Sequence, residues 1–372
     1  MPKKLCTRCV LPDSYPGITF DYQGVCSICK QYGNWTREWK LLLAKRKKIL
    51  HDICAKAKNK NKEFDALIPY SGGKDSTYVL YVSKEELGLN CLAFTFDNGY
   101  LSDHARNNIN KTCKKLGVEH IYYSFNPDLM NRLYALFVRK TGYPCSVCMR
   151  AMAVGIDKVA ELYDIPIIIS GTSSRTELLG TKEMSEHGST AHMRAVLKGE
   201  PIALECRRML STYNNRRKIG HALFRLTGRK MLISYAMFQL ADYIDWNIKN
   251  IQETIRREVG WKSPEESEHM DCIIHPIQNY IQTRRFPEIE LDRLKFAKLI
   301  MVGQMTREEA LHKLQNSKTQ DPKPALDRFL KDIKMTKEEF DKYIDMGPRH
   351  LQYDAPTLMD KIVKKVFNSQ IS

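Results

Sequence analysis

Short apolar runs alternate with longer amphipathic segments through the middle of the chain. Four runs consist mostly of apolar and aromatic residues and end at turn residues: 64–70, 91–96, 120–125 and 165–170. Such runs are typical of strands buried on both faces of a sheet. The segments between them are long enough for helices, which indicates parallel strands joined by helical crossovers. The pattern therefore predicts an α/β fold built on a parallel sheet.

The pattern changes toward both ends of the chain. The first residues are rich in cysteines and turn formers, a basic segment with apolar positions at helical spacing follows, and the last part is charged and helical. In that last part, 305–309 and 335–339 each place a glutamate three residues after a threonine, which predicts a capping box at a helix start. We divide the chain into a cysteine module, a basic helix or linker, an α/β domain and a helical C-terminal region: 1–35, 36–62, 63–284 and 285–372.

The segment after the first predicted strand has the features of an anion-binding loop. It consists of Tyr70, Ser71, Gly72, Gly73, Lys74, Asp75 and Ser76. The paired glycines let the backbone turn tightly and present N–H groups beside a helix N-terminus, and the serines add hydroxyl donors. Lys74 adds a positive charge, and Asp75 is suited to help hold Mg²⁺. The spacing differs from the Walker motif, which argues against an ordinary kinase or GTPase loop.

The predicted parallel sheet indicates which other loops lie near this one. Parallel sheets bind ligands outside the carboxyl ends of their strands. We therefore expect the loops after Tyr70, Phe96 and Ser170 to share one cleft.

The N-terminal cysteines have the spacing of a structural zinc site. Cys6 and Cys9 form one C-x-x-C pair, and Cys26 and Cys29 form another. Four thiolates can close a tetrahedron around Zn²⁺ and stabilise a segment too small to have its own core. A closed site of this kind leaves no open coordination position, so we expect a structural role.

Composition and charge narrow the class of protein. The chain has 43% hydrophobic and 27% charged residues, which excludes a wholly disordered protein. A formal charge of +16, with 13 basic and 4 acidic residues in the first 60, favours anionic partners such as nucleic acid, nucleotides or a phosphorylated substrate. Its eleven cysteines occur without a signal-peptide-like or membrane-spanning apolar run. We therefore expect a soluble, cytoplasmic protein without membrane attachment or a disulfide framework.

Ser-Gly-Gly-Lys-Asp-Ser after a strand resembles the signature of the PP-loop ATP pyrophosphatases. These enzymes split ATP between its α and β phosphates and transfer AMP to an oxygen of the substrate. The resemblance implies that the loop from Tyr70 to Ser76 grips the pyrophosphate, with Lys74, Asp75 and Ser76 as catalytic residues. It also implies that ends of two later strands complete the ATP site: Phe96, Asp97, Asn98, Gly171 and Thr172. Residues 171–177 differ from the His-Asn-x-Asp-Asp type segment of many tRNA-modifying relatives, which argues against an ordinary tRNA thiolase or lysidine synthetase.

A third C-x-x-C pair, Cys145 and Cys148, precedes a helical pattern, and a helix start stabilises thiolates. The pair resembles the segment of PP-loop tRNA thiolases that holds an iron–sulfur cluster through three cysteines. This resemblance implies a third ligand, for which Cys272 is the first candidate and Cys206 the second. A second zinc with a histidine from 269–275, a redox pair and a packed structural pair remain open on spacing alone.

Several motifs together point to one family. They are Cys-Thr-Arg-Cys-Val-Leu-Pro, Gly-Val-Cys-Ser-Ile-Cys, Tyr-Ser-Gly-Gly-Lys-Asp-Ser, Thr-Gly-Tyr-Pro-Cys-Ser-Val-Cys, Glu258-Val-Gly-Trp261 and His269-Met-Asp-Cys272. With these motifs the chain resembles the N-acetyl sugar amidotransferases of bacterial surface-polysaccharide pathways, a group that includes the pseudaminic-acid and mannuronic-acid amidino-forming enzymes. The resemblance covers most of residues 5–290.

The family resemblance implies an ATP-dependent ligase that forms AMP and pyrophosphate. It would convert the N-acetyl group of a nucleotide-activated or nonulosonic sugar to an acetamidino group, in the synthesis of O-antigen, capsule or flagellin glycans. Mg²⁺ would assist, and Arg207 and Arg208 are candidates for holding the anionic substrate. The chain shows no Gly-x-Cys-x-Gly nucleophile turn of a glutaminase. The resemblance therefore implies a glutamine amidotransferase and a cyclase-like barrel as partners that supply ammonia.

Two other functions compete with this interpretation. A PP-loop tRNA-modifying enzyme such as a tRNA thiolase would share the adenylation chemistry, the C-x-x-C pair and the basic surface. A zinc-ribbon binding protein with a merely regulatory nucleotide loop would share the cysteine module. The altered segment at 171–177 and the lack of a second zinc motif near the C-terminus favour the sugar enzyme, so we do not expect nucleic acid as the partner.

Overall fold

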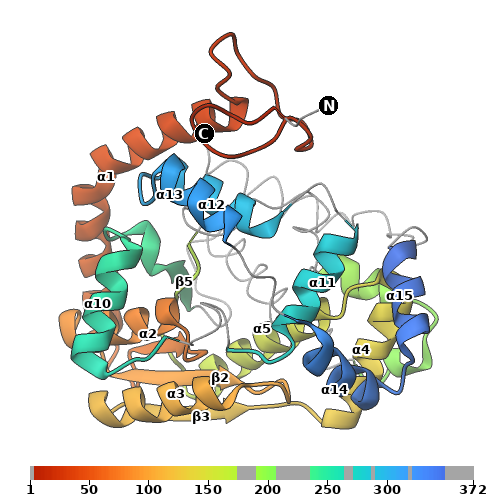
Figure 1. Cartoon of the computed structure of the whole chain (residues 1–372). Helices are drawn as coiled ribbons and strands as arrows, with labels where there is room; N and C mark the ends of the chain where they lie inside the picture. Colours follow the sequence, from red (N-terminus) through yellow and green to blue (C-terminus); the bar gives the residue numbers. More distant parts are fainter. Residues whose placement is uncertain are drawn as a thin grey trace, which may run out of the picture.

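The chain folds around a parallel sheet with helices on both of its faces (Figure 1). We describe it from a computed structural model, in which the placed residues are 4–173, 190–206, 235–263, 271–285, 290–316 and 321–347. The sheet has five strands in the order β3-β2-β1-β4-β5, and every neighbouring pair is parallel. The strands are β1 (Ala66–Pro69), β2 (Cys91–Phe96), β3 (Glu119–Tyr123), β4 (Ile167–Ser170) and β5 (Ala236–Gln239). The α/β class predicted from the sequence is confirmed.

Helices and short turns fill the connections between the strands and form the C-terminal part. The helices are α1 (Ser27–Lys58), α2 (Lys74–Tyr81), α3 (Asp103–Leu116), α4 (Pro127–Thr141), α5 (Cys145–Leu162), α7 (Thr190–Leu197), α10 (Ile248–Val259), α11 (His275–Arg285), α12 (Leu291–Met301), α13 (Arg307–Gln315), α14 (Lys323–Ile333) and α15 (Lys337–Met346). A π-helical turn, η1 (Val82–Glu86), continues α2, and 3₁₀ turns occupy η2 (Pro201–Ala203) and η3 (Leu240–Asp242). The two predicted capping boxes are both formed, at the starts of α13 and α15.

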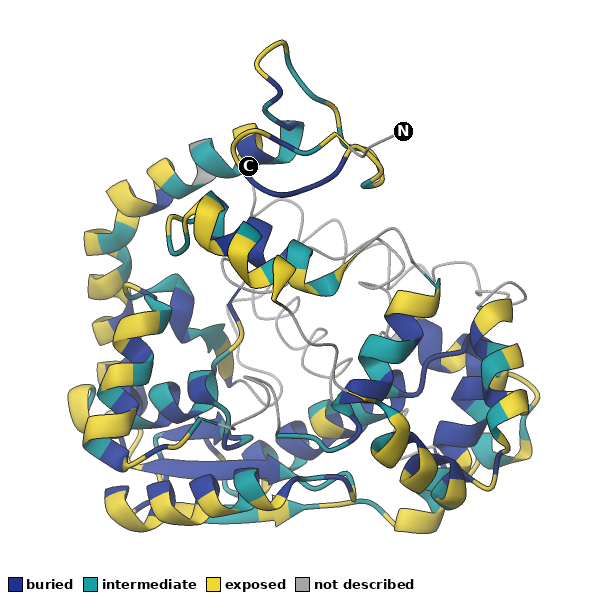
Figure 2. Ribbon diagram, in the orientation of Figure 1, coloured by how far each residue is buried: buried dark blue, intermediate teal, exposed yellow. Residues whose placement is uncertain are grey.

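Successive strand residues point into two different cores, as the pleat of a strand requires. Ile68 and Ala93 join a core with residues of α1, α2, α3 and α10 on one face of the sheet. Leu67 and Phe94 join a core with α5 on the other face. β1, β2 and β4 are consequently buried on both faces, whereas β3 and β5 at the two edges of the sheet are exposed or partly buried. Figure 2 shows the buried residues of the sheet in dark blue. This burial explains why the three inner strands have no alternating polar positions in the sequence.

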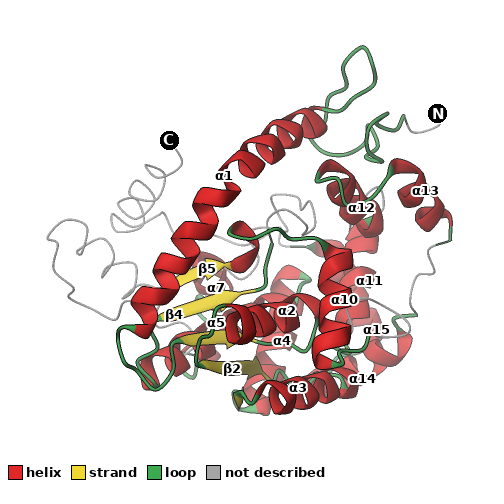
Figure 3. Cartoon of the chain, turned by 90° about the vertical axis from the view of Figure 1, so that its left-hand side faces the viewer, coloured by secondary structure: helices red, strands yellow, loops and turns green. Residues whose placement is uncertain are grey.

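The C-terminal helices pack on the rest of the chain in two groups. α11, α14 and α15 share a core with α4 and α5, in which Phe329 stacks edge-on against Tyr134 and Phe340. α12 and α13 share another core with the N-terminal cysteine module. The N-terminal cysteine module therefore lies beside α12 and α13 (Figures 1 and 3).

Helix α1 is longer than the basic segment predicted at 36–62. It begins at Ser27, inside the cysteine module, because the sulfur of Cys26 accepts a hydrogen bond from the Cys29 N–H and caps the helix. The helix then runs 32 residues to the sheet (Figure 3). Over the described residues, no helix combines the length and apolar character needed to cross a lipid bilayer.

Candidate functional site

The backbone of the glycine turn between β1 and α2 is fixed by contacts with α3 and with Trp261. Gly72 has a φ of 79°, and a Cβ atom there would lie 2.7 Å from the carbonyl oxygen of Ala105, so only glycine fits. Its own carbonyl oxygen accepts hydrogen bonds from Trp261 Nε1 at 2.9 Å and from Asn108 Nδ2 at 3.3 Å. The turn is thus fixed by α3 and by a tryptophan nearly two hundred positions away. Trp261 belongs to a motif in the sequence that carried no predicted role.

The open side of the same turn is lined by hydroxyl groups and N–H groups. The side-chain oxygens of Ser71 and Ser76 lie 3.2 Å apart, and Ser76 Oγ donates to the Gly73 carbonyl at 3.1 Å. The Ser71 N–H donates to Ser76 Oγ and the Gly73 N–H to Ser71 Oγ. Because Gly73 is the N-cap of α2, no side chain caps the first turn of that helix. Uncapped N–H groups at a helix start are the donors that bind phosphate groups in proteins.

Lys74 and Asp75 form an ion pair beside this cradle. Lys74 Nζ lies 2.7 Å from Asp75 Oδ2, and the lysine side chain is only 8% exposed. The other carboxylate oxygen, Asp75 Oδ1, is buried and has no hydrogen-bond partner. A buried carboxylate oxygen without a donor is costly, and a cation beside it would remove that cost. The residues therefore fit a divalent cation such as Mg²⁺, which prefers carboxylate oxygen.

The loop after β4 touches the first turn of α2. A Cβ atom on Gly171 would lie 3.0 Å from the carbonyl carbon of Asp75 and 3.1 Å from the Ser76 backbone nitrogen. The Thr172 hydroxyl lies next to it, 3.1 Å from Ser170 Oγ. The carboxyl ends of β1 and β4 thus meet, and the absence of a side chain at Gly171 keeps the helix start uncovered.

Phe96, Asp97 and Asn98, for which the family resemblance implies a role in the ATP site, lie at the end of β2 and in the loop after it. Phe96 packs against Phe125, with 6.2 Å between ring centroids. Asp97 forms an ion pair with Arg106 at 2.8 Å, which raises the pKa of that guanidinium. The side chain of Asn98 lies at the cysteine group formed by α5 and the 271–273 segment, as described below.

Residues 271–273 run beside the loop after β2. The Ser102 N–H donates to the Asp271 carbonyl at 3.0 Å, and the Ile273 N–H donates to the Tyr100 carbonyl at 2.8 Å. This pairing brings the Asp271 carboxylate toward the glycine turn, because its Oδ2 would lie 3.7 Å from a Cβ atom on Gly73. Asp271 was not singled out from the sequence, although its neighbour Cys272 was.

Cys145, Cys148 and Cys272 converge at the start of α5. α5 begins at Cys145, as predicted, and Asn98 Nδ2 donates to Cys148 Sγ at 3.4 Å and to Cys272 Sγ at 3.6 Å. Burial raises the pKa of Cys148 to about 12, while hydrogen-bonding groups of Asn98 and Tyr134 oppose the rise. Of the two candidates for a third ligand, Cys272 is therefore the one that shares a contact with Cys148. We refer to these three cysteines as the second cysteine site.

The surroundings of the second cysteine site are rich in donors. The Tyr134 side chain is 1% exposed, and its hydroxyl lies close enough to Cys148 to lower the pKa of that thiol. A buried hydroxyl next to thiols is suited to donate to an electron-rich group such as thiolate or sulfide. The residues thus fit a metal-containing group held by sulfur.

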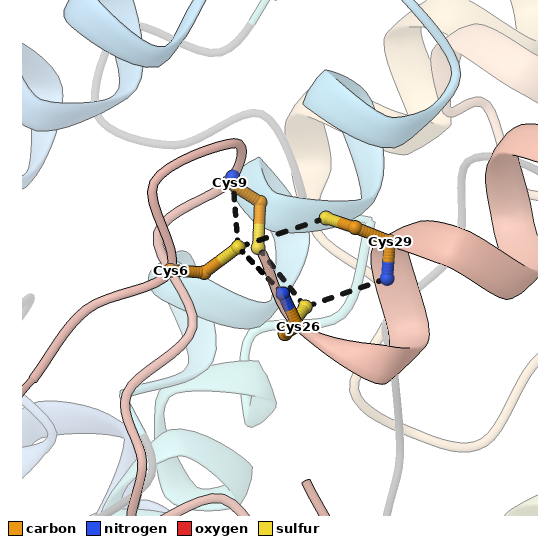
Figure 4. Close-up of side chains that lie close together, drawn as sticks. All are labelled: Cys6, Cys9, Cys26 and Cys29. Atoms are coloured by element: carbon orange, nitrogen blue, oxygen red, sulfur yellow. Dashed lines mark hydrogen bonds between the residues drawn. The ribbon is translucent and has the colours of Figure 1, made fainter. Parts of the chain in front are cut away.

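The four N-terminal cysteines form a compact group (Figure 4). Their sulfur atoms all lie within 4.8 Å of one another, and Cys6–Cys29 and Cys9–Cys26 are each separated by 3.9 Å. Tetrahedral zinc with bonds of about 2.3 Å places its sulfur ligands at nearly this separation. Hydrogen bonds with Cys26 raise the pKa of Cys9 and Cys29, and hydrogen bonds from Cys29 and Cys9 lower the pKa of Cys26.

The sulfurs of Cys9, Cys26 and Cys29 thus lie close enough together to shift one another's pKa in opposite directions. A dication would offset the charge of further thiolates, so the buried set fits Zn²⁺ as a structural ion. Among the residues that the structure describes, these four cysteines are the only group of three or more His, Cys, Asp or Glu side chains close enough together to hold a metal ion. The sulfurs of the second cysteine site do not form such a compact group in this structure.

Some predicted residues fall outside the described part of the chain. These are Arg207, Arg208 and His269. Cys206 is described and is buried in the core that α4 shares with the C-terminal helices.

Parts of the chain are similar to a known protein family and to two curated proteins. Residues 243–365 match the family of LPS biosynthesis proteins that are WbpG-like, through the model of its C-terminal domain. The chain is 28% identical to the uncharacterized protein MJ1599 of Methanocaldococcus jannaschii over 187 residues, which are 49% of this chain and 63% of that protein. It is 26% identical to MJ1016 of the same organism over 152 residues, 40% of this chain and 50% of that protein. The chain thus spans between half and two thirds of the length of these curated relatives.

Two solved structures overlap with most of the chain at low similarity. The U34-tRNA thiolase NcsA from Methanococcus maripaludis, solved with its 4Fe–4S cluster, has a TM-score of 0.33 and 14% identity, covering 86% of this chain and 91% of that one. The NMN synthetase from Francisella tularensis has a TM-score of 0.30 and 13% identity, covering 84% and 95%. Scores this low carry no argument about function.

Proposed function

We propose that this protein is an ATP-dependent amidotransferase that converts the N-acetyl group of an activated sugar to an acetamidino group. The observation that carries the proposal is the rigid glycine turn with its paired hydroxyls, buried Lys74 and unsatisfied Asp75 oxygen. These groups suit the pyrophosphate part of ATP and a divalent cation. The match of residues 243–365 to WbpG-like LPS biosynthesis proteins supports a role in surface-polysaccharide synthesis.

The chemistry follows from the weak reactivity of an amide. Nitrogen resonance makes the N-acetyl carbonyl a poor electrophile. The amide oxygen attacks the α-phosphorus of ATP, pyrophosphate leaves, and loss of the amide proton gives an O-adenylated imidate. Ammonia then adds to the imidate carbon, loses a proton, and the carbon–oxygen bond to AMP breaks. The products are the acetamidino sugar, AMP and pyrophosphate, so atoms and charges balance.

The side chains of the turn have separate roles in the first step. The N–H groups at the start of α2 and the hydroxyls of Ser71 and Ser76 orient the departing pyrophosphate. Lys74 stabilises the negative charge that develops on it, once ATP competes for the amine that now pairs with Asp75. A Mg²⁺ ion held by Asp75 would add charge neutralisation when bound. Gly171 keeps the space in front of the helix start free of side-chain atoms.

The second step needs ammonia that is not protonated. Ammonium dominates at neutral pH and has no lone pair for attack. We therefore include in the proposal a glutamine amidotransferase and a cyclase-like barrel as partners that deliver ammonia to this chain. Zn²⁺ at the four N-terminal cysteines has a structural role in the proposal, and the second cysteine site holds a further metal or an iron–sulfur cluster.

The test uses purified protein with ATP, Mg²⁺, a nucleotide-activated N-acetyl sugar and an ammonium salt at alkaline pH. We expect AMP and pyrophosphate in equal amounts, and a sugar product in which NH replaces oxygen. Ser76→Ala and Asp75→Asn should lower the rate by roughly 10²-fold or more. Ser83→Ala is the matched control, because the Ser83 hydroxyl is buried without a partner outside the loop. Absence of AMP formation with active ammonia supply contradicts the proposal.

A tRNA thiolase is the second candidate, favoured by the convergence of three cysteines next to the loop after β2. It predicts that tRNA binds with an affinity that falls steeply as salt rises. ATP-dependent sulfur incorporation into tRNA, together with no reaction on sugar, would select this function. Pyrophosphate release that depends on a sugar nucleotide would select the first one and would also exclude a purely regulatory nucleotide loop.

A further inference from the structure

We propose that Asn98 is a positioning residue for the second cysteine site, where its amide donates to the sulfur ligands of a metal group. Its Nδ2 atom lies 3.4 Å from Cys148 Sγ and 3.6 Å from Cys272 Sγ. One side chain from the end of β2 thus contacts sulfurs on two other segments, α5 and 271–273. The inference rests on the proposed function only in that it takes the second cysteine site as a metal site.

The orientation of the amide follows from a second contact. The Tyr100 backbone N–H donates to Asn98 Oδ1 at 2.8 Å. An N–H group can donate only to the oxygen of an amide, so the NH₂ group is forced to the opposite side. The sulfurs therefore receive hydrogens from Asn98 and act as acceptors, which is the role of metal-bound thiolate.

The turn that carries Asn98 is braced on both sides. Arg328 of α14 donates to the Gly99 carbonyl at 3.1 Å, and the Tyr100 hydroxyl donates to Asp332 of the same helix at 3.1 Å. On the other side, Asp97 accepts from the Gly99 N–H at 3.0 Å and pairs with Arg106. A braced amide keeps its direction when neighbours move, as a group that orients metal ligands must.

Donors of this kind change the properties of a sulfur-held metal. Hydrogen bonds to ligating sulfur stabilise the thiolate charge and shift the reduction potential of a cluster. Groups that orient metal ligands contribute roughly 10- to 100-fold to metal affinity. We therefore expect Asn98 to determine how firmly the second cysteine site holds its metal. If Asn98 instead lines the adenosine pocket, as the family resemblance implies, its substitution should weaken ATP binding and leave metal binding unchanged.

The experiment compares Asn98→Asp with wild type in the full chain, purified without oxygen. Asn98→Asp keeps an oxygen for the Tyr100 N–H, so the turn is retained, but it places a carboxylate against two sulfurs. Asn110→Asp, on the exposed side of α3, is the control for the added charge. Cys272→Ala identifies which metal belongs to the second cysteine site. The readouts are zinc and iron content, visible absorbance, the rate of metal release to a chelator, and the Kd for ATP.

The expected result is metal release from the second cysteine site at least tenfold faster in Asn98→Asp than in Asn110→Asp. The zinc of the four N-terminal cysteines, retained in the same sample, shows that the variant is folded. Unchanged release with a tenfold weaker Kd for ATP would overturn the inference in favour of an adenosine contact. Wild-type protein without metal at this site would overturn it too, whereas AMP and pyrophosphate formation tests the proposed reaction separately. If Asn98→Asp does not fold, Asn98→Ser provides the same comparison with a smaller change.

Discussion

Arg307 Nε donates a hydrogen bond to the carbonyl oxygen of Cys9 at 3.1 Å, although the two residues are 298 positions apart. The same nitrogen lies 3.3 Å from the carbonyl oxygen of Cys6. Arg307 is the first residue of α13, so the backbone of the first cysteine pair and the start of a C-terminal helix hold each other in place. Loss of order in the cysteine module should therefore also destabilise α13.

Removal of metal from the module is the first prediction. Cys9→Ser should abolish zinc binding there and lower the free energy of unfolding by about 2 kcal/mol or more, because the cysteines share a core with α12 and α13. Thermal unfolding and zinc analysis measure the two effects. Cys54→Ala, which removes a lone buried thiol from the sheet core, is the control. Equal destabilisation by both variants, with zinc retained in Cys9→Ser, would contradict the prediction.

The glycine turn should not tolerate a side chain. Gly72→Ala combines a φ of 79° with a Cβ placed 2.7 Å from the Ala105 carbonyl oxygen, and we expect a loss of roughly 3 kcal/mol together with loss of ATP binding. Gly117→Ala also has positive φ, 60°, but meets nothing within 4 Å, so it should cost only about 1 kcal/mol. Calorimetry of unfolding and ATP titration separate the two. Similar costs for both variants would show that the close approach to α3 is unimportant.

The indole of Trp261 should contribute to ATP binding without touching ATP. Trp261→Phe removes the 2.9 Å hydrogen bond to the Gly72 carbonyl, which we expect to cost about 1 kcal/mol and to weaken ATP binding several-fold. Trp246→Phe is a close control, since the Trp246 indole N–H is equally buried but has no partner. ATP affinity from titration calorimetry should fall in the first variant and stay near wild type in the second.

His120 should make the protein sensitive to mild acid. Burial lowers the pKa of His120 to about 4, from an ordinary value near 6.5. At higher pH the ring is neutral in both states and has no effect. As the pH falls below about 6.5, His120 binds a proton in the unfolded chain but stays neutral in the folded chain. The free energy of unfolding therefore decreases until the pH reaches about 4, where the folded chain is protonated too. His120→Gln, which can keep a bond to Thr95, should lose less stability over this window in pH-dependent unfolding. Parallel curves for the two proteins would contradict the assignment.

The strands that could be predicted are those with unbroken apolar runs. β2 matches its predicted segment, β1 and β4 lie within theirs with ends shifted by one or two residues, and β3 begins one residue before its predicted segment. β5 was not predicted, although three of its four residues, Ala236–Gln239, are apolar; it is short and lies exposed or only partly buried at the sheet edge. The start of α1 was also missed, since its cap is a thiol and the usual capping signals are hydroxyl and amide side chains.

The candidate site could be predicted only where its residues are neighbours in sequence. The loop from Ser71 to Ser76 and the two N-terminal cysteine pairs carry their chemistry in local spacing. The contact of Asn98 with Cys272 spans 174 positions and depends on the pairing of residues 271–273 with the loop after β2. No local pattern encodes such a pairing, so sequence analysis did not connect Asn98 with the second cysteine site and assigned Asp271 no role.

Cys26 both caps α1 and belongs to the four-cysteine group. This double role has a consequence for the thiols while the chain is being synthesised. Residues 6–29 are translated before residues 291–315, which form α12 and α13 and share a core with these cysteines. During that interval the nascent chain carries four accessible sulfurs near the N-terminus of α1, a helix roughly 48 Å long. Early capture of a cation would shield them from oxidants, so cellular zinc supply at the time of synthesis should limit the yield of intact protein.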